Sequence, residues 1–192
     1  TPAPPPPTIE EFIGTEVDGV YTNKYFKFRL TEPEDYEFVE SQSAEMMSRA
    51  GIDKVKGENR STNKRLDEAA AKQSTLFGWM MLPRGSLNNA VLEGHVLKQV
   101  PGVTANMALL ASTNLMTATP SFKLEKTLGN VTFGKRAFAG STIAANFNGM
   151  KFKIDTYVLM VRGYSLHFAV TYYDDEGKKK MTDLLRTIEF LK

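Results

Sequence analysis

The amino-acid sequence predicts an α+β domain built around an antiparallel sheet. Many of its apolar runs are short and rich in aromatic and β-branched residues, which is typical of strands. Several of these runs are joined by tight-turn signals, and helices do not alternate regularly with them, so an all-parallel sheet is not indicated. Other segments carry apolar residues three and four positions apart, which indicates amphipathic helices.

The chain of 192 residues opens with a proline-rich segment, residues 1–8, and we expect one domain over residues 9–192. Proline fixes φ and has no backbone N–H, so this opening predicts an extended tether. Such a tether suits an exported protein attached upstream to a membrane surface. A plain disordered terminus is the alternative.

The first elements follow from capping and alternation. The capping-box spacing from Thr8 to Glu11 predicts a short helix that ends at Gly14. Residues 17–21 and 25–30 then read as a hairpin that turns at 22–24, with Phe26, Phe28 and Leu30 on one buried face.

The next segment predicts helices separated by a polar connection. Apolar residues among acidic ones indicate a helix over 34–50 that stops at Gly51. Residues 53–65 are almost wholly polar and predict an exposed loop before an alanine-rich helix at 66–73.

The middle of the chain predicts two paired strands and a helix. Residues 76–82 and 90–100 are expected to pair antiparallel through the turn signals at 83–89. A helix follows over 103–117 and cannot continue past Pro120. Its apolar spacing predicts a buried stripe, formed by Met107, Leu110, Leu115 and Met116.

The C-terminal part predicts a meander closed by a helix. Asn148-Gly149 and Arg162-Gly163 suit tight reversals, because these residue types tolerate positive φ. A solvated turn at 174–177 precedes an amphipathic helix running from Met181 to Ile188. The predicted strands cover residues 122–127, 131–133, 137–147, 151–162 and 164–173.

Composition argues against most catalytic chemistry. The chain has no cysteine and two histidines, which excludes disulfides, thiolate metal sites and cysteine nucleophiles. Motifs for serine hydrolases, zinc proteases and nucleotide binding are absent. A Ser-His-Asp triad could still assemble from His95 or His167, but both lie in strand-like runs and are interpreted as surface or satisfied sheet histidines. We therefore predict no catalytic residue, no metal and no cofactor.

Charge and hydropathy bear on the partners. A net charge of +2 gives no broad basic surface for nucleic acid. The sequence has no apolar run long enough to span a bilayer. Lys178-Lys179-Lys180 is a basic cluster that suits either anionic headgroups or a solvated helix face, and the second is favoured.

Two further segments are candidates for a binding site. Trp79, Met80 and Met81 combine aromatic and soft side chains that suit a ligand pocket, although core packing explains them equally well. The acidic turn at 174–177 offers oxygen ligands to a hard cation, but it lacks the spacing of a calcium loop. A solvated turn before a helix is the favoured interpretation.

Two stretches of the chain resemble PsbP/Mog-like domains of small exported bacterial lipoproteins. The first is Gly19 to Phe28, followed by Pro33 and a helix. The second is the glycine-turned hairpin from Val158 to Leu166, followed by the ending Leu184 to Phe190. The resemblance implies an α/β/α sandwich around an antiparallel sheet, export, attachment through a lipidated cysteine upstream of Thr1, and a non-catalytic role.

The sequence thus predicts a non-enzymatic, extracytoplasmic binding or assembly module, anchored to the cell surface or envelope. Its partner, a protein or an envelope component, and its oligomeric state stay open. A small-ligand carrier with a pocket between helix and sheet near Trp79 is the alternative, and a hydrolase that uses unrecognised carboxylates is a third.

Overall fold

The computed structural model describes residues 7–32, 36–82, 89–147 and 149–192. Most of the predicted tether therefore lies outside the described residues. So do Pro33, the turn residues 83–88 and Asn148. None of the described helices combines the length and the hydropathy needed to cross a bilayer.

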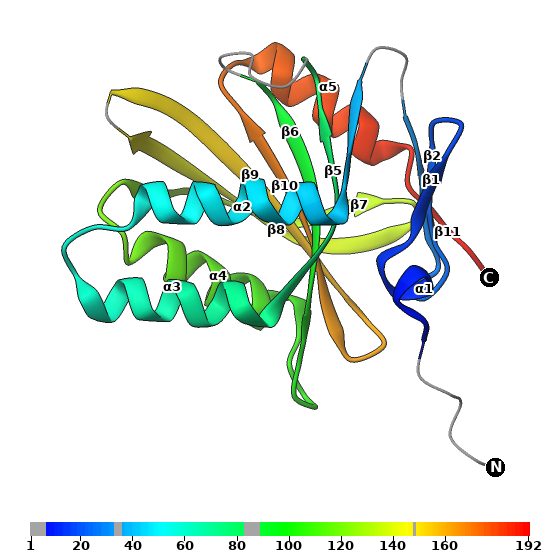
Figure 1. Cartoon of the computed structure of the whole chain (residues 1–192), viewed down its shortest axis with the longest axis horizontal. Helices are drawn as coiled ribbons and strands as arrows, with labels where there is room; N and C mark the ends of the chain where they lie inside the picture. Colours follow the sequence, from blue (N-terminus) through cyan, green and yellow to red (C-terminus); the bar gives the residue numbers. More distant parts are fainter. Residues whose placement is uncertain (1–6, 33–35, 83–88, 148) are drawn as a thin grey trace.

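Within these ranges the chain folds into helices and two antiparallel sheets (Figure 1). The helices are α1 (Ile9–Ile13), α2 (Ser41–Val55), α3 (Arg60–Lys72), α4 (Ala105–Thr117) and α5 (Asp175–Arg186). The smaller sheet, in the order β1-β2-β3-β11, contains β1 (Thr15–Val17), β2 (Val20–Asn23), β3 (Phe28–Thr31) and β11 (Glu189–Phe190). The larger sheet contains β4 (Glu37–Glu40), β5 (Gln73–Met80), β6 (Val91–Lys98), β7 (Phe122–Phe133), β8 (Arg136–Phe147), β9 (Met150–Val161) and β10 (Tyr164–Tyr172).

The larger sheet has the order β4-β5-β6-β10-β9-β8-β7, and its last four strands form the predicted meander. The predicted pairing of the strands around 76–82 and 90–100 is also confirmed, as β5 and β6. Helices α2, α3 and α4 pack on one face of this sheet, and α5 packs on the other (Figure 1). The predicted layers are thus present, and α5 shares its layer with the smaller sheet.

The main core lies between the larger sheet and the layer of α5 and the smaller sheet. Tyr21 and Phe28 of the smaller sheet, Leu184 of α5, and Trp79 and Phe168 of the larger sheet are all buried in it. Phe26, Phe28 and Leu30 are buried as predicted. Met181, Leu184 and Leu185 form the buried face of α5. Alternation along each strand directs these side chains to one side of the larger sheet.

Two predictions for the first 40 residues are wrong in detail. The predicted hairpin is present as β2 and β3, but β2 continues through Thr22 and Asn23, so the turn lies at 24–27 instead of 22–24. A further turn at Asp18 and Gly19, both with positive φ, joins β1 to β2. The segment assigned to the start of a long helix forms β4 instead, which pairs with β5. Tyr36, Phe38 and Val39 are apolar enough for either state, and the free edge of β5 decides the outcome.

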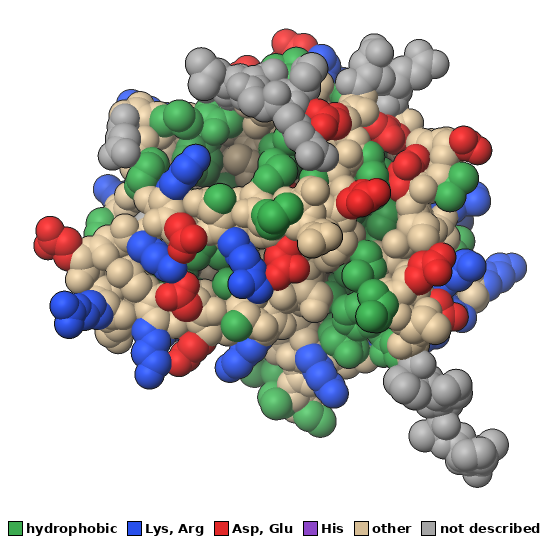
Figure 2. Space-filling view, in the orientation of Figure 1, with side chains coloured by type: hydrophobic (Ala, Val, Ile, Leu, Met, Phe, Trp, Pro, Cys, Tyr) green, Lys and Arg blue, Asp and Glu red, His purple; other side chains and the backbone are tan. Residues whose placement is uncertain are grey.

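The polar stretch 53–65 is largely helical, which corrects the predicted loop. Helix α2 continues through Gly51 to Val55, and Asn59 caps α3 by accepting a hydrogen bond from the backbone N–H of Thr62 at 3.1 Å. Charged residues on these helices form short-range ion pairs, such as Arg49 with Glu45. Figure 2 shows basic and acidic side chains interspersed on the face that carries α2 and α3.

Two further predictions fail in the second half. The predicted strands 122–127 and 131–133 are one edge strand, β7, because bulges next to Glu125 and Leu128 absorb the irregular pattern. Helix α4 buries Ala108, Leu109 and Thr113, whereas Met107 and Leu110 are more than half exposed. The helix is therefore rotated relative to the predicted stripe.

Candidate functional site

A hollow of about 610 Å³ lies at one end of the larger sheet, beside the start of α5. It is lined by residues from the end of β8 and from the starts of β7 and β9, together with the segment that joins β10 to α5. The lining residues are Pro120, Ser121, Lys123, Ala144, Ala145, Asn146, Lys151, Phe152, Lys153, Tyr172, Tyr173, Asp174, Asp175 and Lys178.

Strand register places part of this lining in one row. Lys123 of β7 is opposite Ala144 of β8, Ala144 is opposite Lys153 of β9, and Lys153 is opposite Tyr172 of β10. Directly opposed residues point to the same face of a sheet. Ala144 has a small side chain and lies between Lys123 and Lys153, so the hollow is shallow at Ala144 and has a lysine on each side.

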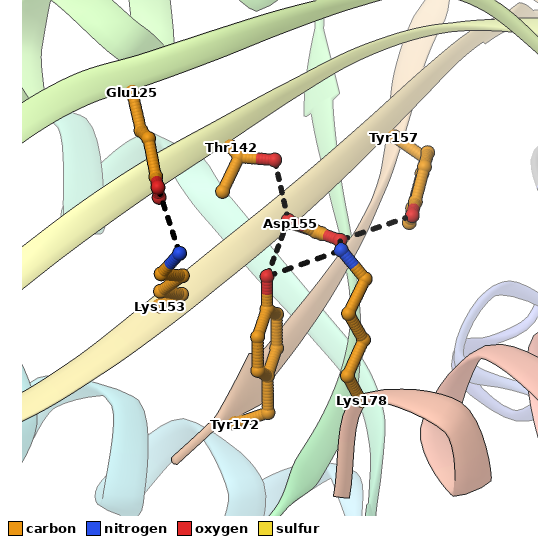
Figure 3. Close-up of polar contacts among 7 residues, drawn as sticks. All are labelled: Glu125, Thr142, Lys153, Asp155, Tyr157, Tyr172 and Lys178. Atoms are coloured by element: carbon orange, nitrogen blue, oxygen red, sulfur yellow. Dashed lines mark hydrogen bonds and ion pairs between the residues drawn. The ribbon is translucent and has the colours of Figure 1, made fainter. Parts of the chain in front are cut away.

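Two residues that line the hollow, Tyr172 and Lys178, bind the buried carboxylate of Asp155 (Figure 3). Asp155 has no exposed surface and forms an ion pair of 2.9 Å with Lys178 Nζ. It accepts hydrogen bonds from Thr142 Oγ1 at 2.7 Å and from the Tyr172 hydroxyl at 3.1 Å, and a longer one from Tyr157 at 3.4 Å. Three strands and α5 are thereby joined at one group.

The electrostatics hold Lys178 and the two tyrosines in a single protonation state at neutral pH. Burial opposes the charge of Lys178, but its hydrogen bonds to Asp155 and Tyr172 outweigh this and raise the pKa of the ammonium. Burial, followed by the charge of Asp155, raises the pKa of Tyr157. Burial also raises the pKa of Tyr172. The ammonium stays charged and both hydroxyls keep their protons as donors.

The lysines around the hollow differ in their partners. Lys153 forms an ion pair of 2.7 Å with Glu125, and Lys178 is bound to Asp155 (Figure 3). Lys123 and Lys151 are exposed and form no ion pair within the described residues. These two ammonium groups are the ones left to meet an external anion.

Aromatic side chains border the same hollow. The Phe152 ring lies 5.7 Å from the Tyr173 ring and 6.4 Å from the Phe122 ring, between centroids. The Tyr173 hydroxyl contacts Met150 Sδ at 3.5 Å. The site therefore presents both cationic and apolar groups to a ligand.

The binding residues proposed from the sequence lie elsewhere. Trp79 has no exposed surface and packs against Tyr21, Phe38 and Phe77 in the main core. Met80 is buried in another cluster with Val39 and Ala44, and Met81 is half-buried. None of the three lines the hollow beside α5, or a smaller one of about 370 Å³ between α1, α2 and β5. Their role in binding stays a prediction.

The two histidines face each other across β6 and β10, on the side of the larger sheet that α2, α3 and α4 cover. His95 Nδ1 lies 3.2 Å from Thr75 Oγ1, and His167 Nε2 lies 2.9 Å from Ser165 Oγ. Both side chains are buried, so they are sheet histidines with polar partners and not surface ones. The described residues contain no group of histidine and acidic side chains that fits a metal ion.

The acidic turn and the lysine run acquire specific roles. Asp174 caps α5 by accepting a hydrogen bond of 2.7 Å from the backbone N–H of Gly177, so the helix begins earlier than predicted. Lys178 points into the buried cluster, which corrects its assignment to a solvated face. Lys179 and Lys180 remain on the surface, paired with Asp183 and Glu176.

Sequence reasoning missed Asp155 altogether. The available signal was a single acidic residue inside the apolar run Ile154 to Val161 of a strand. A charged residue in such a position has to find partners if its side chain is buried. The identity of those partners depends on strand register, which the sequence pattern alone does not provide.

Comparison with solved structures identifies the fold. The structure of cyanobacterial PsbP from Synechocystis superposes with a TM-score of 0.54 at 9% identity, over 92% of this chain and 95% of that one. The chain has the PsbP-like fold. LpqN, a protein involved in cell envelope biogenesis of Mycobacterium tuberculosis, superposes on this PsbP-like domain with a TM-score of 0.50 at 12% identity, over 86% of this chain and 83% of that one.

The recognition made from the sequence is thus confirmed at the level of fold. No protein-family model matches the PsbP-like chain, and no curated sequence is detectably similar to it. At these identities the likeness concerns backbone architecture, so the hollow is interpreted from its own residues.

Proposed function

We propose that this PsbP-like domain is a non-enzymatic, extracytoplasmic binding or assembly module that contacts an envelope component through the hollow beside α5. The observation that carries the proposal is which charged side chains around the hollow already form ion pairs and which do not. Asp155 and Lys178 satisfy each other, whereas Lys123 and Lys151 are exposed without an ion pair in the described residues. The charges of Asp155 and Lys178 are therefore used within the domain, and Lys123 and Lys151 can bind an external partner.

The cluster is a poor candidate for acid–base catalysis. A general acid or base needs a pKa near the working pH and access to the substrate. The Asp155 carboxylate is fully buried, and Lys178 has its pKa raised, away from neutrality. These properties favour a structural role and do not support the hydrolase alternative.

The shape of the site also favours a binding role over that of a carrier. Enclosed ligand sites bury most of a small molecule among apolar side chains. The Trp79 side chain has no exposed surface for a ligand, whereas the hollow beside α5 has exposed lysines on its border. The part that LpqN takes in envelope biogenesis supports an extracytoplasmic location for a domain of the same fold.

Site-specific photo-crosslinking in the cells that produce the protein tests this function. A photoreactive amino acid replaces Lys151 at the hollow, and a second variant carries it at the exposed Lys64 of α3 as the control. We expect an adduct from position 151 that position 64 does not give, in the envelope fraction. Equal adducts from both positions, or recovery of the protein from the cytosol, would refute the proposal.

A further inference from the structure

The end of the β8–β9 hairpin combines exposed apolar and basic side chains. We define the hairpin tip as Phe147, Met150, Lys151 and Phe152. Met150 is 45% exposed and Lys151 is exposed, and both phenylalanines are half-buried. In Figure 1 the two strands, coloured yellow and gold, project from one end of the larger sheet at the upper left.

The core does not require Met150 at this position. The nearest buried cluster ends at Phe122, Ile143 and Ala145, with Phe152 packed against its edge. Met150 lies outside that cluster and contacts the Tyr173 hydroxyl through its sulfur. A single exposed apolar residue is ordinary on a protein surface, and Met150 is notable only together with the charged residues near it.

Two lysines without an ion pair in the described residues lie at the same end of the sheet as Met150, on the opposite face. Lys151 follows Met150 directly, and Lys123 lies two strands away at the same end of the sheet. Of the acidic groups near them, Asp174 caps α5 and Asp155 binds Lys178, whereas Asp175 is exposed at the border of the hollow. A surface that approaches the end of these strands meets both faces, and exposed apolar side chains next to lysines are typical of surfaces that bind anionic membranes.

The tip is also held in place before any contact is made. Register pairs Phe147 with Met150, and Ala145 with Phe152, across the two strands. Tyr173, which follows β10, contacts both Phe152 and Met150 from the side. A surface ordered in advance loses less conformational entropy when it binds.

We propose that the hairpin tip docks onto an anionic lipid surface, with Met150 entering the interfacial region and Lys123 and Lys151 binding headgroup phosphates. This inference rests on the proposed function and names the envelope component as lipid. A soluble phosphate compound would need the two lysines alone. The exposed Met150 beside them gains burial only against an apolar phase.

Co-sedimentation of the whole chain with vesicles tests the inference. The vesicles contain phosphatidylcholine alone or with phosphatidylglycerol, at low and at physiological salt. We expect binding that requires phosphatidylglycerol and weakens with salt. The double variant Lys123→Gln/Lys151→Gln should bind about 25-fold more weakly, since one lysine near such a surface contributes about fivefold.

Matched variants test whether vesicle binding depends on the hairpin tip or only on the overall charge and hydropathy of the chain. Lys64→Gln/Lys72→Gln removes the same charge from α3, and Met46→Gln replaces another exposed methionine, on α2. Both should bind like the parent chain. Met150→Gln should weaken binding while preserving its salt dependence, because it removes an apolar contact only.

The inference is overturned if the parent chain ignores phosphatidylglycerol vesicles, or if the α3 double variant loses as much binding as the Lys123/Lys151 variant. Perturbation of Lys123 and Lys151 by inorganic phosphate, without vesicle binding, would show a site for soluble anions instead. A protein adduct at position 151 combined with no vesicle binding would remove this inference and leave the proposed function in place.

Discussion

Asp155 of β9 and Lys178 in the first turn of α5 form an ion pair of 2.9 Å in which the carboxylate is fully buried and the lysine side chain is 38% exposed. The pair is asymmetric, because one partner can reach water and the other cannot. Their contact fixes the start of α5 on the sheet and thereby shapes one wall of the hollow.

Replacing Lys178 is expected to destabilise the fold through the carboxylate that it leaves behind. Loss of one partner of a buried pair leaves an unpaired charge, and partial exposure of Lys178 reduces the expected loss to about 2–3 kcal/mol for Lys178→Met. Urea denaturation at neutral pH measures it. The double variant Asp155→Asn/Lys178→Met should recover part of the loss, and Lys179→Met should change little. A Lys178→Met chain as stable as the parent would disprove this role.

Acidification should destabilise the protein through His167. Burial, and then the nearby His95, lower the pKa of His167 to about 3 from an ordinary value near 6.5. Between these values the unfolded chain binds a proton that the folded chain does not, so stability falls as the pH decreases. The contribution is about 1.4 kcal/mol for each pH unit below about 6.5, and it ends near pH 3.

Denaturation midpoints between pH 7 and pH 4 check this expectation. His167→Gln removes the titrating group and keeps a polar side chain beside Ser165. The slope of stability against pH should be smaller in this variant than in the parent chain. Identical slopes in the two proteins would show that other groups account for the acid sensitivity.

Helix α4 offers a test of the difference between pattern and structure. The spacing of its apolar residues predicts that Met107 and Leu110 are buried, but they are 54% and 58% exposed. Met107→Lys and Leu110→Lys should therefore change the unfolding free energy by less than about 0.5 kcal/mol. Leu109→Ala, at a site 6% exposed, should cost about 2–4 kcal/mol. A large loss in the lysine variants would restore the orientation predicted from the sequence.

This error has a simple physical origin. Residues 99–122 contain no charged residue, so α4 lacks the polar contrast that defines a helix face. The face with Ala108, Leu109 and Thr113 packs on the sheet, and Met107 and Leu110 are left outside. In an uncharged segment the apolar spacing does not distinguish Leu109 from Leu110. Where polar contrast is strong, as in α5, the predicted face with Leu184 and Leu185 is the buried one.

Elsewhere in the fold, the sequence predicted features whose contacts lie within a few residues of one another. The capping box at Thr8 and Glu11 predicted α1 because both of its hydrogen bonds lie within four residues. The hollow beside α5 could not be found in this way, because it depends on pairings between distant segments. Lys123 and Lys153 share one row only through the register of β7, β8 and β9.

Two glycine substitutions test packing, one in the core and one on a helix surface. A Cβ built on Gly94 of β6 would lie 2.4 Å from a ring carbon of Phe77, which is opposite it on β5 beside a bulge and has no exposed surface. Neither residue has room to move in a close-packed interior, so Gly94→Ala should destabilise the protein by about 2 kcal/mol or more.

Gly51 lies in α2 with nothing within 4 Å of its own added Cβ. Gly51→Ala should therefore stabilise the fold by about 0.5–1 kcal/mol, through helix propensity alone. Thermal and urea unfolding of the two variants should give shifts of opposite sign, and a neutral Gly94→Ala would mean that β5 and β6 are not in this register.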